Sequence, residues 1–356
     1  MTVPPLTDSA TATPFRETDL ELIDALQVNP RASWTQMGGV LGVDPVTVAR
    51  RWQRLAQAGE AWVTVALGQR QLHSMNMAFL ELSCEPGATA EVAAALADEP
   101  HLITIQHIAG AYDLWVIALA PSLTDLSDYL LRRVPLHPGV RQVRTHVATR
   151  VYDASRRWRL RVLTGEQVRA LRPVTSTPTE SARPLEKSDR DLFVALSVDG
   201  RLAFRDLEKQ LGMSARAVQR RVSRLLASDD LTFRCDLARP LAGWHAGAVL
   251  WLSLPDDKLD ETGRALLAWS QTRTCAAVAG SSNMLLTVGL HALTDLHDLV
   301  TRIRTQFPYV SIADRRVTLR QVKLYGRVLD NDGRCVSATP VDPWALSGQG
   351  QATGPW

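Results

Sequence analysis

Arginine side chains recur on one face of a short helix that the sequence predicts twice. In the first copy, residues 45–58, Val48, Trp52 and Leu55 form an apolar stripe with helical spacing, which turns the polar side chains to the opposite face. Guanidinium groups in such a row suit contacts to phosphate oxygens and to guanine edges, the two ways in which proteins hold and read DNA. We expect DNA contacts from polar residues of both copies, namely Thr47, Arg50, Arg51, Arg54, Arg216, Arg220, Arg221 and Arg224.

The chain around the first arginine row predicts three short helices, over residues 19–28, 34–41 and 45–58. Gly42 ends the second helix, because glycine adopts the left-handed conformation there easily, and Pro45 suits the first turn of the third. Helices joined by a tight glycine turn form a helix-turn-helix, whose last helix enters the major groove of DNA. An arginine-rich face alone is more often a solvated surface. Here the glycine turn, the capped third helix and the arginines coincide twice, which favours DNA binding.

The whole pattern repeats at an offset of 170 residues. The offset persists downstream, where Gly110 falls on Gly280 and the Leu-Thr-Asp-Leu run from Leu123 falls on the same run from Leu293. Chance similarity would drift out of phase along the chain. One constant offset therefore indicates duplication of a complete unit and excludes a solenoid of short repeats.

Each helix-turn-helix is followed by a segment with the pattern β-α-β-β-α-β, the ferredoxin-like arrangement. One face of such a sheet is covered by its helices and the other is left for a partner. We therefore expect the two β-α-β-β-α-β domains of one chain, called effector domains below, to pair with each other. The predicted fold is α+β, two copies of a helix-turn-helix (winged-helix-like) domain followed by a ferredoxin-like effector domain. The expected segments are a disordered N-terminus (1–15), helix-turn-helix 1 (16–60), effector domain 1 (61–152), a linker with a short helix (153–185), helix-turn-helix 2 (186–231), effector domain 2 (232–327) and a disordered tail (328–356).

This architecture resembles the feast/famine regulators, the Lrp/AsnC family. Three motifs carry the resemblance: the helix-turn-helix pattern of residues 19–55, a Gly-Ala-Tyr-Asp turn before an apolar strand at 110–113, and a Pro-Gly-Val entry to the last strand at 138–140. The resemblance implies a cytoplasmic transcription regulator whose partners are double-stranded DNA and a small-molecule effector. It also implies homo-oligomers formed through the effector domains.

Many members of the family bind an amino acid or a related metabolite near this turn. The resemblance therefore implies effector contacts from Gly110, Tyr112 and Asp113, and from Gly280 and Asn283 at the matching turn. A carboxylate at Asp113 suits an α-ammonium group. The alternative, that Gly110 and Asp113 only shape a hairpin turn, is equally open. The second turn reads Gly-Ser-Ser-Asn, so that half binds either nothing or something less cationic.

Composition excludes several classes of function. The four cysteines lie far apart without a Cys/His cluster, so we expect no metal site, and no phosphate-binding or dinucleotide motif indicates a cofactor. The histidines show no acid–base pairing, and we predict no catalytic residue. No apolar run approaches the ~20 residues that a membrane span needs, and the N-terminus does not read as a signal peptide.

Two alternatives to a ligand-controlled DNA-binding regulator stay open. Some tandem proteins similar to this family are enzymes that decarboxylate sirohaem-type tetrapyrroles, which would require a histidine–tyrosine pair near the sheet cavity and arginines for the propionates. A protein that senses a ligand without binding DNA would show eroded recognition helices, whereas both copies keep their arginines.

If the two effector domains of one chain pair, the chain is a pseudo-dimer, a dimer-like molecule made from one chain, with two unequal helix-turn-helices. Such a protein should prefer an asymmetric DNA site, because operator symmetry mirrors protein symmetry.

Overall fold

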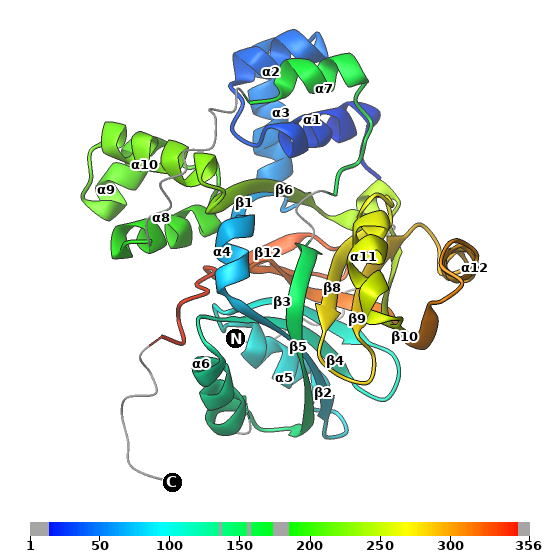
Figure 1. The fold of residues 1–356 in the computed structure, drawn as a ribbon. Coiled ribbons are helices and arrows are strands. Elements are labelled where there is room, and N and C mark those ends of the chain that lie inside the picture. The colour runs from blue at the N-terminus through cyan, green and yellow to red at the C-terminus, as the bar shows by residue number, and fades with distance from the viewer. Residues whose placement is uncertain (1–13, 135–136, 155–157, 174–184, 348–356) are drawn as a thin grey trace.

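The two helix-turn-helix units form where the sequence predicts them (Figure 1). The computed structural model describes residues 14–134, 137–154, 158–173 and 185–347, so most of the segment expected to be a disordered N-terminus, 1–15, lies outside the described residues. The helices of the first unit are α1 (Glu17–Val28), α2 (Trp34–Leu41) and α3 (Pro45–Gln57). Those of the second are α8 (Lys187–Val198), α9 (Phe204–Leu211) and α10 (Ala215–Ala227).

Side-chain caps and glycine turns set the ends of these helices. Ser33, Asp44 and Ser214 accept backbone N–H bonds at the starts of α2, α3 and α10, which satisfies donors that have no partner within the helix. Gly42 and Gly212 end α2 and α9 with φ of 68° and 64°, a region that glycine enters without a steric penalty. The glycine turn and the capped third helix are therefore confirmed in both copies.

Both effector domains have the predicted β-α-β-β-α-β order. The elements of the first are β2 (Asn76–Cys84), α5 (Thr89–Ala97), β3 (Leu102–Ile108), β4 (Leu114–Ala120), α6 (Leu123–Asp128) with a following π-helical turn (Tyr129–Arg133), and β5 (Val140–Ala154). Those of the second are β7 (Ala246–Ser253), a 3-10 turn (Asp256–Lys258), α11 (Leu259–Leu267), β8 (Thr272–Val278), β9 (Met284–Leu290), α12 (Asp295–Gln306) and β10 (Ser311–Leu324).

The two effector domains pair edge to edge into one closed sheet. β3 of the first domain pairs with β10 of the second, β5 pairs with β8, and β10 also pairs with β7. The strands therefore follow a ring in the order β10-β3-β4-β2-β5-β8-β9-β7 and back to β10. The two effector domains of one chain pair as expected, although the expectation rested on their open sheet faces and the hydrogen bonds here join strand edges. The closed ring leaves none of its eight strands with a free edge.

A separate two-stranded sheet connects the helix-turn-helix units to the ring. β1 (Ala61–Leu67) runs antiparallel to β6 (Leu231–Leu237), and Thr64 pairs with Arg234, its counterpart at the 170-residue offset. A pseudo-twofold axis therefore passes through this pair. A helix, α4 (Gln69–Ser74), follows β1, and a 3-10 turn (Arg239–Ala242) follows β6, each leading into its own effector domain.

Part of the expected linker belongs to the first helix-turn-helix. The predicted short helix is present as α7 (Gly165–Leu171), with a capping box between Thr164 and Gln167. Arg159 makes an ion pair at 2.9 Å with Asp24 of α1, which is fully buried. Residues 158–172 thus form an additional layer on the first unit, and residues 174–184 lie outside the described part of the chain.

The prediction of a disordered tail from residue 328 is wrong for its described part, residues 328–347. β10 continues into β11 (Arg327–Leu329) and β12 (Cys335–Ala338), and the Cys335 N–H donates to the carbonyl of Gly59 at 2.8 Å. Trp344 is buried against Phe193 of α8, with ring centroids 5.5 Å apart. Polar and glycine-rich composition concealed these few apolar anchors, and burying them offsets the entropy of ordering the segment.

Candidate DNA-binding surface and ligand pocket

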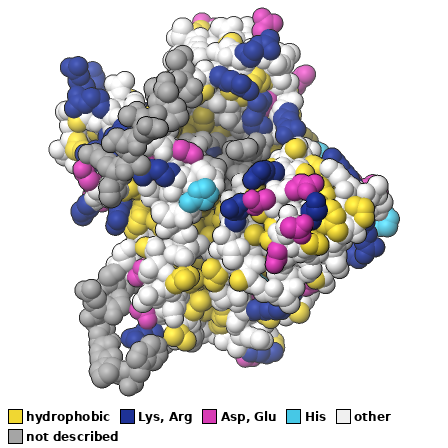
Figure 2. Space-filling model, in the orientation of Figure 1, with side chains coloured by type: hydrophobic (Ala, Val, Ile, Leu, Met, Phe, Trp, Pro, Cys, Tyr) yellow, Lys and Arg dark blue, Asp and Glu magenta, His cyan; other side chains and the backbone are white. Residues whose placement is uncertain are grey.

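The third helix of each helix-turn-helix presents its arginines on the side away from the core. Val48, Trp52 and Leu55 of α3 are buried, as are the matching apolar residues of α10. Val46, at the start of α3, is 75% exposed, so the N-terminal turn stands clear of the protein. Lys and Arg side chains lie over the outward sides of both units in Figure 2, at the top and upper left.

In α3, two of the predicted DNA-contacting arginines are held by an acidic residue of α1. Arg54 makes an ion pair at 2.7 Å with the buried carboxylate of Asp19 and a second at 3.1 Å with Glu60. Arg51 lies 3.9 Å from the same Asp19 carboxylate and donates to the carbonyl of Thr18 at 3.2 Å. These two guanidinium groups therefore join α3 to α1.

The second unit repeats this arrangement at the 170-residue offset. The buried Asp189 carboxylate accepts from Arg221 at 2.7 Å and from Arg224, and Arg221 also contacts Glu186 at 3.2 Å. The long sequence separation between aspartate and arginines hid this role from the sequence analysis. Two of the three predicted arginines in the first unit and two of the four in the second therefore have a structural partner.

The remaining predicted residues form the outer face of the recognition helices. Arg50 on α3 and Arg216 and Arg220 on α10 are exposed, and among the described residues none has an ion pair. Thr47 lies half-buried one turn before Arg50. These side chains are available to a polyanion without first breaking a contact within the protein.

The predicted effector turn is stabilised by its own side chains. Gly110 has φ of 130°, a conformation that favours glycine, and the Asp113 carboxylate accepts the N–H of Cys84 at 2.7 Å. The guanidinium of Arg316, from the other effector domain, lies 4.9 Å from the centre of the Tyr112 ring. The turn thus meets the second effector domain through Tyr112, while Asp113 ties β4 to the end of β2.

The matching turn of the second copy uses an amide for the same purpose. Gly280 has φ of 151°, and the Asn283 side chain both accepts the N–H of Leu254 at 3.1 Å and donates to its carbonyl at 2.7 Å. Leu254 is the counterpart of Cys84. The replacement of aspartate by asparagine therefore keeps the bond that fixes the turn.

A buried charged cluster that the sequence analysis missed lies between the domains. The Glu81 carboxylate contacts Arg316 at 2.7 Å and His146 at 3.1 Å, and the His146 ring packs on Trp251 at 4.2 Å. His146 and Arg316 occupy matching positions, as do Glu81 and Trp251. The pseudo-twofold axis thus relates an acid to an indole, which makes the interface chemically asymmetric.

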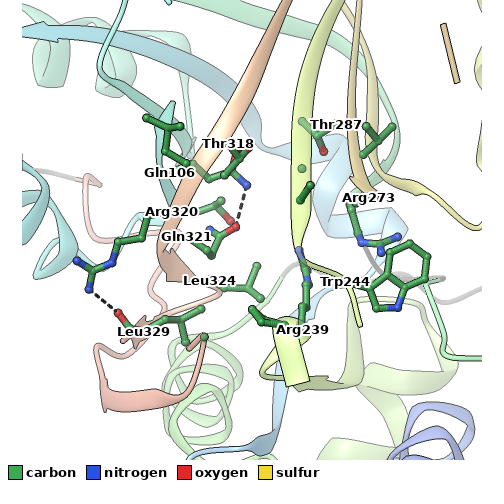
Figure 3. A pocket seen from close by; sticks show the side chains of 18 of the residues that line it. Gln106, Arg239, Trp244, Arg273, Thr287, Thr318, Arg320, Gln321, Leu324 and Leu329 are labelled. Carbon is green, nitrogen blue, oxygen red and sulfur yellow. Dashed lines mark hydrogen bonds between the residues drawn. The ribbon is translucent and has the colours of Figure 1, made fainter. Parts of the chain in front are cut away.

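A cavity lies between the ring of strands and the segment that follows β6. Its volume is about 320 Å³. Gln106, Thr318 and Gln321 line one wall, and Arg239, Trp244, Arg273 and Thr287 lie on the opposite side (Figure 3). The Gln106 amide donates to Gln321 at 2.8 Å, whereas Arg320 turns to the carbonyl of Leu329 at 3.2 Å.

Two arginines on one side of this cavity were not among the predicted site residues. The guanidinium of Arg273 packs against two indoles, 4.2 Å from the centre of Trp158 and 4.5 Å from that of Trp244. Burial lowers the pKa of Arg239, and the charge of Arg234 adds to this effect. Burial lowers the pKa of Arg273 well below its usual value, and the charge of Arg239 adds to that effect. Aligning the two copies could have identified Arg273 as a candidate, because the matching position in the first copy is the apolar Ile103.

Comparisons with known proteins agree with this architecture. The model of the AsnC-type helix-turn-helix domain matches residues 17–56 and 185–226, and that of the Lrp/AsnC ligand-binding domain matches residues 77–158. The HTH-type transcriptional regulator LrpA of Mycobacterium tuberculosis is 31% identical over 123 residues, which span 34% of this chain and 82% of LrpA. The chain belongs to the Lrp/AsnC family. It is a DNA-binding transcription regulator of that family with two helix-turn-helix units.

Further matches show how the tandem form relates to single-unit relatives. An HTH-type regulator of Pyrococcus abyssi is 25% identical over 136 residues, 38% of this Lrp/AsnC chain and 86% of the relative. The crystal structure of the siroheme decarboxylase NirDL matches 89% of this chain and 94% of its own, with a TM-score of 0.55 and 14% identity. That similarity shows a shared fold. No helix in the described part of the chain is long and apolar enough to cross a membrane.

Proposed function

We propose that this chain regulates transcription as a built-in dimer, in which α3 and α10 contact DNA and a small molecule adjusts the affinity. The observation that carries the proposal is the presentation of two exposed recognition-helix faces by one connected scaffold. β1 and β6 pair across the pseudo-twofold axis, and each leads directly from its recognition helix. The two faces are thereby held in a fixed relation to each other.

The DNA contacts that we propose centre on Arg50, Arg216 and Arg220, with Thr47 beside them. These side chains are exposed or half-exposed on the outer faces, whereas Arg51, Arg54, Arg221 and Arg224 spend part of their hydrogen-bonding capacity on buried aspartates. The first group can approach base edges or phosphates, and the second group can add phosphate contacts only through its outward N–H groups.

Selection from a pool of random-sequence duplex DNA tests the proposal. The two faces differ in sequence. At the 170-residue offset, Val46, Thr47 and Arg50 of α3 correspond to Arg216, Ala217 and Arg220 of α10. A pseudo-symmetric protein with unequal faces should enrich two unequal half-sites. Enrichment of a perfect palindrome, or no enrichment at physiological salt, would contradict the built-in dimer.

The effector contacts at Gly110, Tyr112, Asp113, Gly280 and Asn283 remain a prediction. A ligand ammonium at Asp113 would compete with the N–H of Cys84 for the same carboxylate. Further association of two chains through their effector domains also remains a proposal, which light scattering on the purified protein tests directly.

A second candidate function is tetrapyrrole decarboxylation, favoured by the fold shared with NirDL over 89% of this chain. The cavity carries Arg239 and Arg273, together with His245 at an exposed position and the buried Tyr325. We favour a regulator without enzymatic activity, because a volume of about 320 Å³ is at the low end for pockets that hold drug-sized ligands and a tetrapyrrole is larger. Incubation with sirohaem, followed by mass spectrometry for loss of carbon dioxide, separates the two functions.

A further inference from the structure

The cavity that contains Arg239 and Arg273 has a counterpart in the first copy. The space in the first copy is nearly filled, whereas that in the second copy is open. Matching positions line both spaces, with Leu67, Met77, Ile103 and Leu119 in the first copy and Leu237, Gly247, Arg273 and Gly289 in the second. The first space has a volume of about 10 Å³ and the second about 320 Å³. Side-chain size accounts for the difference, because glycines replace a methionine and a leucine.

The first space is also covered by the C-terminal segment. Val341 and Pro343 line it together with Phe193 of α8 and Tyr325. The matching segment after the first effector domain packs on the first helix-turn-helix instead, where Leu171, the counterpart of Val341, is buried. One of two originally equivalent spaces is thus filled by apolar groups, while the other is kept open.

The open cavity is lined by hydrogen-bond donors that have nothing to bind. Nε and Nη2 of Arg239, Nε1 of Trp115 and Oγ1 of Thr104 are buried, and none has a hydrogen-bond partner among the described residues. An unsatisfied buried polar group is costly, so a ligand that reached these four groups in the wall of the cavity would gain their hydrogen bonds. Three of these four atoms can only donate, so the ligand must be rich in acceptors.

The charged residues around the cavity indicate which charge a ligand would carry. Gly289 leaves space for the guanidinium of Arg273, because a Cβ on this glycine would lie 2.5 Å from Nη2. The one carboxylate among the lining residues is Asp330, which already accepts the N–H groups of Asp332 at 3.0 Å and Arg334 at 2.7 Å. Arg239 and Arg273 therefore bring two positive charges to a cavity whose lining residues include one carboxylate.

We propose that this cavity binds a small organic anion, a carboxylate or a phosphate ester, through Arg239 and Arg273, with its apolar body against Trp244 and Leu324. An amino acid fits less well than the corresponding acid without an amine, because its ammonium group would face two guanidinium groups. The effect of this anion on DNA binding rests on the proposed function, whereas the binding itself does not.

Binding is tested on the full chain by thermal shift and isothermal titration calorimetry. The probes are succinate, 2-oxoglutarate, benzoate, phosphoenolpyruvate and glycerol 3-phosphate, with leucine as the amine-bearing comparison. Arg239→Gln and Arg273→Ile each install the residue of the first copy, and Arg304→Ala removes an exposed arginine outside the cavity as a matched control. Circular dichroism without ligand confirms that each variant folds, and Arg239→Gln serves alone if loss of the buried Arg273 prevents folding.

At least one anion should raise the melting temperature of the wild-type chain, and its Kd should weaken about tenfold or more in each cavity variant but not in Arg304→Ala. Preference within the probe set for carboxylates or for phosphates identifies the source of the anion. Three results would overturn the proposal: no probe binds at about 10 mM, only leucine binds, or the shift survives in Arg239→Gln.

A mobility-shift assay with and without the bound anion separates this proposal from the proposed function. An anion that binds through Arg239 and changes DNA affinity supports both. Binding without any change in DNA affinity contradicts the regulatory role but leaves the site intact. Absence of DNA binding in every condition contradicts the proposed function alone.

Discussion

Arg31 and Arg201 join the two helix-turn-helix units, because each donates hydrogen bonds to backbone carbonyls of the other unit; this pair of contacts is called the arginine clasp. Arg31 donates to the carbonyls of Gly200 at 2.6 Å and Leu202 at 3.1 Å, and Arg201 donates to the carbonyls of Pro30 at 2.6 Å and Ala32 at 3.0 Å. Each guanidinium also covers an aromatic ring of the other unit, Phe204 or Trp34. The two arginines occupy matching positions in the repeat, so the clasp obeys the pseudo-twofold axis.

Arg31→Ala and Arg201→Ala should each lower the free energy of unfolding by about 2–3 kcal/mol, because each removes two charge-assisted hydrogen bonds and a cation–π contact. Urea denaturation followed by circular dichroism measures this loss. Arg205→Ala, an exposed arginine on α9, is the matched control. Equal stability of Arg201→Ala and Arg205→Ala would refute the clasp.

Asp189→Asn should destabilise the second unit by about 1–3 kcal/mol, because Arg221 and Arg224 lose the buried carboxylate that they share. Asp191→Asn removes a neighbouring carboxylate whose partner, Lys187, is 88% exposed, and should cost well under about 1 kcal/mol. Chemical denaturation of the two variants side by side decides the point. An equally small effect in both would mean that the Asp189 contacts contribute nothing measurable.

His101 should make the protein less stable in acid. Burial lowers its pKa to about 3 from 6.5, with help from the charges of Arg133 and Lys323, although Glu99 lies 3.3 Å away and Tyr129 packs on the ring. The unfolded chain therefore binds the extra proton between these two pH values, so stability is complete above about pH 6.5 and falls below it, by up to about 1.4 kcal/mol per pH unit.

His101→Gln, which installs the residue of the matching position 271, should flatten the dependence of unfolding free energy on pH below pH 6.5. His73→Gln, at an exposed histidine, is the control and should leave the slope unchanged. The comparison is made by urea titration at a series of pH values. Identical slopes in the two variants would show that the His101 proton is not coupled to folding.

Trp344→Ala should cost about 3 kcal/mol, because it removes a buried indole that packs on Phe193 and lies 5.4 Å from the guanidinium of Arg190. Val336→Ala, at a side chain that is 54% exposed, should change stability by less than about 0.5 kcal/mol. Thermal unfolding of both variants tests whether the C-terminal segment stabilises the fold. A wild-type melting temperature for Trp344→Ala would exclude it.

The sequence predicts the elements of this fold well because local signals set most of their ends. Gly42, Gly212 and Asp44 act within a few residues of their own positions, so their roles can be read without the tertiary structure. The constant offset of the repeat also predicts that the two effector domains pair. The described tail was missed because its anchors, such as Trp344, are few and lie within a polar segment.

The site was harder to predict because its contacts join distant parts of the chain. Nothing local to Arg54 reveals that Asp19 will hold it, and a helical wheel alone places Arg50 and Arg54 on the same face. The aligned copies show that Arg273 occupies the position of Ile103. That this difference places an arginine in a cavity becomes visible only in the structure, where the two residues line matching cavities. Only the folded ring of strands brings Arg273 to a cavity with Arg239.

DNA affinity as a function of salt is the most direct test of the central claim, that Arg50 and Arg220 on two linked recognition helices bind DNA. Fluorescence anisotropy with a selected duplex should show Arg50→Ala and Arg220→Ala each weakening binding by about 1–3 kcal/mol, or reducing the salt slope by about one where the contact is to phosphate. Arg304→Ala, exposed on α12, should leave affinity and slope unchanged. Wild-type affinity and slope in both Arg50→Ala and Arg220→Ala would contradict the claim.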